Sequence, residues 1–128
     1  MNGVDEVLAE AESFAQAWGQ AHYETALAGS LPASRPEVGV EDLAAARDRL
    51  KAFAVERLGE GRASFVGLAE NILDAQTALG SAHRRADDRQ SYQAGVAVGR
   101  AEKGLEVAEA ALREGANLTR LAALGDQR

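Results

Sequence analysis

The stretch FVGLAENILDAQTALGSAHRRA, residues 65–86, sets the architecture of this chain. Its apolar and small side chains recur at alternating steps of three and four residues without a miss. These positions are Phe65, Leu68, Ile72, Ala75, Leu79, Ala82 and Ala86. Such heptad spacing is typical of a helix that lies along other helices and buries one seam against them. We therefore expect the flanking segments to be helices that pack on this one.

A first partner helix is expected over residues 4–28, where an apolar stripe follows helical spacing. The stripe consists of Val4, Val7, Leu8, Ala11, Phe14, Trp18, Ala21 and His22. Acidic residues in the first turns, such as Asp5 and Glu6, favour the positive end of the helix dipole. The next segment, GSLPASRPEVGV over residues 29–40, contains both prolines of the chain and predicts a loop.

Further along the chain, a second helix is expected over residues 41–58 and a third over residues 62–87. Between them, Gly59 and Gly61 together cost about 2 kcal/mol of helix propensity relative to alanine. The heptad phase also slips at Leu58. This combination indicates a turn or a kink, and a stutter inside one long helix is the alternative.

The last helix is expected over residues 91–124, which makes it about 50 Å long. Its seam comprises Ser91, Ala94, Val98, Ala101, Leu105, Ala108 and Leu112, and we expect Leu118, Leu121 and Leu124 to close the helix. The chain as a whole, residues 1–128, is therefore predicted to be a single all-α domain. We expect an elongated antiparallel helical bundle of three or four helices with coiled-coil-like packing.

Composition narrows the classes of function. The chain has a net charge of −6 and no cysteine, which excludes disulfides, thiolate catalysis and thiolate metal sites. Residues 1–40 hold six acids against Arg35 alone, and this acidic segment would repel the phosphates of a nucleic acid. The longest apolar run, residues 94–99, is too short to span a bilayer, and residues 1–10 lack the features of a secretory signal. We expect a cytoplasmic protein that binds neither nucleic acid nor membranes.

The two histidines are weak candidates for a metal or acid–base site. His83 precedes Asp87 by four residues, so the two are neighbours on a helix, with Asp88 beside them. Two or three such groups are fewer ligands than metal sites generally use, and a surface His–Asp pair is the simpler interpretation. His22 lies near Trp18 on the stripe of the first helix, where a packing role is the simpler interpretation. The sequence predicts no catalytic residue and no cofactor, and it favours a non-enzymatic protein.

The last helix has one side built of small residues, including Gly95, Gly99 and Gly104. Small residues allow two helix backbones to approach closely, within the chain or across a dimer, and a merely alanine-rich composition is the alternative. The candidate interaction residues are Phe65, Leu68, Ile72, Leu79, Gly95, Val98, Gly99, Leu105 and Leu112. Because a helical hairpin alone leaves one apolar face exposed to water, we expect a homo-oligomer, dimeric or larger, or a helical protein partner.

The stretch LDAQTALGSAHRRADD, residues 73–88, resembles one helix of the small helical-hairpin proteins of type VII secretion. Those proteins carry a Trp-x-Gly turn between their helices. Here Trp18 is followed directly by Gly19, within a predicted helix, and we assign the chain to no family. The resemblance implies pairing with a helical partner.

Three functions are consistent with these observations. The preferred one is a non-enzymatic helical assembly or adaptor protein that acts through protein–protein contacts on its helix faces. The second is a small metal-dependent helical-bundle enzyme or metal-binding protein that uses His83, Asp87 and His22. The third is a secreted or chaperoned helical hairpin that pairs with a helical partner.

Overall fold

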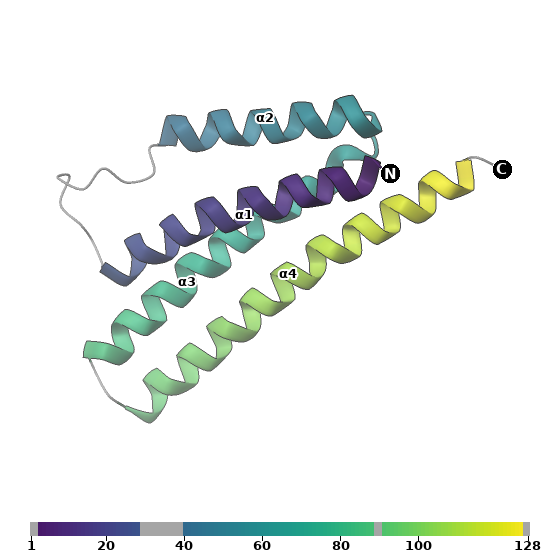
Figure 1. Ribbon diagram of the computed structural model, residues 1–128. Helices are drawn as coiled ribbons and strands as arrows, with labels where there is room; N and C mark the ends of the chain where they lie inside the picture. Colours follow the sequence, from purple (N-terminus) through teal and green to yellow (C-terminus); the bar gives the residue numbers. More distant parts are fainter. Residues whose placement is uncertain (1–2, 29–39, 89–90, 127–128) are drawn as a thin grey trace.

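The computed structural model describes residues 3–28, 40–88 and 91–126 (Figure 1). Its elements are α1 (Gly3–Ala28), α2 (Val40–Leu58), a short 3-10 turn η1 (Ala63–Gly67), α3 (Leu68–Asp88) and α4 (Tyr92–Asp126). These ranges contain no strand, and the prediction of an all-α helical bundle is confirmed. Most of the predicted loop over residues 29–40 lies outside the described residues.

The helices lie side by side in the spatial order α2, α1, α3, α4 (Figure 1). Chain neighbours run in opposite directions, as an antiparallel bundle requires, which leaves α1 and α3 parallel. This parallel pair forms the most extensive packing of the bundle, followed by α3 with α4. The sequence did not indicate that α1 and α3 would pack as parallel neighbours. This pairing arises because α2 lies on the outer side of α1, so that α3 returns along the inner side.

The break between α2 and α3 is a glycine turn. Gly59 has a φ of +88°, a left-handed conformation that glycine adopts without the steric cost of a side chain. Its N–H donates to the Val55 carbonyl oxygen at 2.8 Å, and its own carbonyl accepts from the Ala63 N–H at 3.1 Å. These bonds end α2 and start η1, and the alternative of one long helix through this segment is wrong.

The core follows the predicted seam of α3 and extends beyond it. Phe65, Ile72 and Ala82 are buried, and the other seam positions are half-buried. Because α3 packs against α1 on one flank and α4 on the other, Leu73 and Gly80 are buried too, although they lie outside the seam. A single heptad stripe is thus widened into a surface that covers two neighbouring helices.

The fourth helix is longer than the helices beside it. Ser91 caps its start, since the Ser91 Oγ accepts from the Ala94 N–H at 3.1 Å. With 35 residues, against 26 in α1 and 21 in α3, α4 continues beyond the bundle at its carboxyl end, as Figure 1 shows. None of the helices in the described ranges combines the length and the apolar character of a membrane span.

The three leucines near the end of α4 do not lie on its inner seam. Leu118, Leu121 and Leu124 are 58%, 63% and 52% exposed. A helix turns about 100° per residue, so Leu121, nine positions after the buried Leu112, lies on the opposite side. The inner side is continued by Ala116, which is buried.

Candidate functional site

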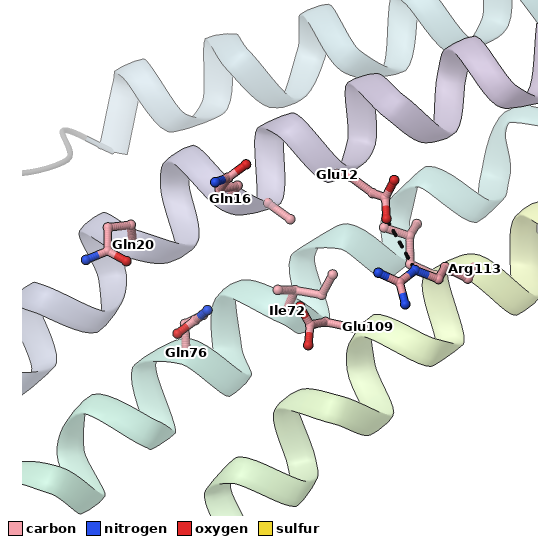
Figure 2. Close-up of a pocket in the computed structure, with 9 residues that line it drawn as sticks. Glu12, Gln16, Gln20, Ile72, Gln76, Glu109 and Arg113 are labelled. Carbon is pink, nitrogen blue, oxygen red and sulfur yellow. Dashed lines mark hydrogen bonds and ion pairs between the residues drawn. The ribbon is translucent and has the colours of Figure 1, made fainter.

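A groove of about 320 Å³ lies where α1, α3 and α4 meet (Figure 2). It is lined by Glu12, Ala15, Gln16, Gln20, Ile72, Gln76, Glu109, Leu112 and Arg113. Polar groups from α1 and α4 meet across it, where the Arg113 Nε donates to the Glu12 Oε2 at 3.3 Å. Ile72 and Leu112 belong to the core, so the lining changes from apolar to polar toward solvent.

The chemistry of this groove is that of a polar surface. None of its lining residues is a histidine, serine, threonine or tyrosine, and its charged side chains are Glu12, Glu109 and Arg113. The charge of Glu12 is compensated by Arg113, and the Gln20 amide donates to Glu24 at 3.0 Å. The groove therefore presents hydrogen-bonding groups and the carboxylate of Glu109.

The two histidines lie at the interface between α1 and α3, and each faces an oxygen of the opposite helix. The His22 Nδ1 is 3.2 Å from the Thr77 Oγ1, and the His83 Nδ1 is 2.9 Å from the Tyr23 Oη. The Tyr23 and His83 rings also meet edge to face, with centroids 5.8 Å apart. Both histidines thus join the parallel helix pair through its polar margin.

The aspartates after His83 do not complete a metal site with it. Asp87 and Asp88 are exposed, and Asp88 lies 3.9 Å from the Arg84 Nε. The Arg84 Nη1 also donates to the carbonyl oxygen of Ala28, the last residue of α1, at 2.6 Å. Within the described ranges, no three His, Cys, Asp or Glu residues gather closely enough to hold a metal ion. His22 and His83 are each bonded to a different side chain instead.

The nine predicted interaction residues fall into two groups. Seven are buried or half-buried: Phe65, Leu68, Ile72, Leu79, Val98, Leu105 and Leu112. Five of these seven belong to the core or pack against it, and they are covered by the chain's own helices. Gly95 and Gly99 are exposed, and a Cβ on either would meet nothing within 4 Å. These two glycines make no close helix contact in this structure.

The close helix contacts of the chain occur at other glycines. A Cβ on Gly115 would stand 2.8 Å from the Leu68 Cδ1, and one on Gly19 would stand 3.1 Å from the Gln76 Cγ. Gly80 leaves even less room against α1. The small-residue contact that the sequence suggested within the chain therefore lies on α1, α3 and the second half of α4.

An apolar surface on α4 is left uncovered by the described part of the chain. We call it the outer face of α4, and it consists of Val107, Leu118, Leu121 and Leu124, each more than half exposed. The signal for it was present in the sequence, because successive 100° rotations from Leu112 place Leu121 on the far side of the helix. The heptad steps that lead to Leu112 continue through positions 115, 119 and 122, so the three leucines lie outside that seam.

Comparison with known proteins gives no further assignment. No family model, no curated protein and no solved structure matches the chain.

Proposed function

We propose that the chain is a non-enzymatic helical assembly or adaptor protein that binds another helical chain through the outer face of α4. The observation that carries this proposal is the row formed by Leu118, Leu121 and Leu124 on a helix end that projects from the bundle. The cytoplasmic location expected from the sequence stays a prediction.

The energetics of leucine exposure support a binding role for this row. Burying one leucine side chain stabilises a complex by roughly 1.5–3 kcal/mol relative to leaving it in water. A single exposed leucine is ordinary, but three leucines spaced three residues apart form a continuous strip on a helix. At about 100° per residue, the three leucines spread over about 120° of the helix surface, on the side away from Leu112.

The contacts of α4 with the rest of the bundle hold that strip on a rigid scaffold. Leu112 and Ala116 are fully buried on the opposite side of α4, and they fix the helix against the core. Near the projecting end, Arg120 bonds to Asp5 of α1. The strip is therefore held in place before binding, so that little conformational entropy is lost when a partner binds to it.

Site-specific photo-crosslinking in the cells that make the protein tests this proposal. A photoreactive amino acid is placed at Leu121, and in a matched control at Lys51, which is exposed on α2. We expect a discrete adduct of defined mass from position 121 and none from position 51. Equal or absent cross-linking at the two positions would contradict the proposal.

A further inference from the structure

We infer that the partner of α4 is a second copy of this chain, whose own α4 packs antiparallel on the first. This inference rests on the proposed function and names its partner. It starts from a second heptad seam on α4, on the side away from the core.

The outer seam runs along nearly the whole helix with alternating steps of four and three residues. Its members are Val96, Arg100, Lys103, Val107, Ala110, Glu114, Asn117, Leu121 and Leu124. All are exposed except Val96, which is half-buried. Heptad spacing on an uncovered side is what a helix needs to pack along a second helix.

The outer seam is complementary to itself when read in reverse. A two-fold axis between Val107 and Ala110 places these two residues opposite one another. The same axis places Lys103 opposite Glu114 and Arg100 opposite Asn117. At the two ends it places Val96 opposite Leu121. Between Val96 and Leu121, every apolar position of the seam thereby faces an apolar one, and each charged or polar position faces a polar partner, whereas Leu124 faces Gln93.

Charge decides between the two directions of packing. In the antiparallel pair, Lys103 of each copy meets Glu114 of the other, and symmetry makes this contact twice. In a parallel pair, Lys103 would face Lys103 and Glu114 would face Glu114, which is destabilising. Glu114 makes no ion pair within the described part of the chain, so its carboxylate remains available for this contact.

A hollow on α4 receives the leucines of the second copy. It measures about 470 Å³, and it is lined by α4 residues alone: Tyr92, Gln93, Val96, Ala97 and Arg100. In the antiparallel register, Leu121 lies opposite Val96, and Leu124 lies opposite Gln93. The leucine-rich end of one helix thus meets the first turns of the other, and the two-fold symmetry makes this contact twice.

Cross-linking of single-cysteine variants tests partner and direction together. The natural chain has no cysteine, so each introduced thiol is unique. Purified Val96→Cys and Leu121→Cys chains, one of them carrying a mass tag, are mixed and treated with a short bismaleimide. We expect a mixed dimer from this pair. Leu121→Cys alone should yield none, because its two thiols lie about 37 Å apart along the antiparallel pair.

A charge exchange gives an independent readout of the register. Lys103→Glu places carboxylates opposite one another in two symmetric contacts, and it should weaken the dimer about tenfold in sedimentation velocity. Adding Glu114→Lys to the same chain should restore association to about the natural level. Far-ultraviolet circular dichroism of each variant confirms that the helices remain formed.

The outcomes separate this inference from the proposed function. A natural chain that sediments as a monomer, while position 121 still cross-links to another protein in cells, would overturn the second copy as partner and leave the proposed function standing. Self-cross-linking of Leu121→Cys would overturn the antiparallel direction. Failure of Glu114→Lys to rescue Lys103→Glu would overturn the register.

Discussion

Gly80 of α3 lies so close to Ala26 of α1 that a Cβ on Gly80 would stand 2.9 Å from the Ala26 Cβ. The Tyr23 carbonyl oxygen is nearer still. Real side chains essentially never approach so closely, and only glycine fits there without moving α1. This contact fixes the spacing of the parallel pair, whose polar margin then aligns Tyr23 with His83.

Replacing this glycine tests the contact. Gly80→Ala should lower the free energy of unfolding by about 1–3 kcal/mol, because the new methyl group forces the helices apart. Gly104→Ala is the matched control, since a Cβ at Gly104 meets nothing within 4 Å. It should raise the free energy of unfolding by about 0.5–1 kcal/mol through helix propensity. Urea unfolding measures both, and equal stabilisation by the two changes would contradict the account.

The two sides of α4 should respond differently to the same truncation. Leu112 is fully buried, so Leu112→Ala should cost about 2–5 kcal/mol of unfolding free energy. Leu121 is exposed in the single chain, so Leu121→Ala should change it by less than about 0.5 kcal/mol. The comparison is made by urea unfolding at protein concentrations where the chain is monomeric. A large loss at Leu121 there would place that side chain in the core.

The hydrogen bond between Tyr23 and His83 should contribute measurably to stability. Tyr23→Phe removes the hydroxyl from the His83 Nδ1 in a half-buried site, and it should cost about 0.5–1.5 kcal/mol. Tyr92→Phe serves as the control at a protein concentration where the chain is monomeric, because Tyr92 is then largely exposed, and it should have no measurable effect. Thermal unfolding of the two variants under one buffer condition decides the matter, and identical melting temperatures would argue against the bond.

The ion pair across the groove of Figure 2 should contribute little to stability. The side chains of Arg113 and Glu12 are 65% and 43% exposed, and pairs of this kind are screened by water and salt. Glu12→Gln should therefore change the free energy of unfolding by less than about 0.5 kcal/mol. Urea unfolding at low and high salt measures it. A large, salt-dependent loss would show that this pair organises the three helices.

The local parts of the fold could be predicted from the sequence because their signals are local. The heptad steps across residues 65–86 predicted the third helix, and Gly59 predicted the turn before it. The pairing of α1 with α3 could not be predicted in this way. That pairing depends on the side of α1 on which α2 lies, and the sequence between them, residues 29–40, has no periodicity that would predict this side. It also depends on the close fit between Gly80 and Ala26, which only the folded backbone reveals.

The interaction surface could have been predicted in part. The residues Leu118, Leu121 and Leu124 were recognised as apolar residues that close the last helix, but they were not among the predicted interaction residues. Helical rotation from Leu112 places Leu121 on the far side of the helix, and heptad counting from Ser91 agrees, because it continues through positions 115, 119 and 122. How far α4 projects beyond α1 depends on the relative placement of the helices, which no stretch of sequence specifies.

The central claim is that another chain covers the outer face of α4, and the most direct test is the reactivity of a thiol at Leu121 in intact cells. Leu121→Cys and the control Lys51→Cys are labelled with a membrane-permeant maleimide, and the labelling rates are compared with those of the urea-unfolded chains. We predict that the thiol at position 121 reacts several-fold more slowly than the thiol at position 51 in cells and equally fast after unfolding. Equal rates in cells would contradict the claim.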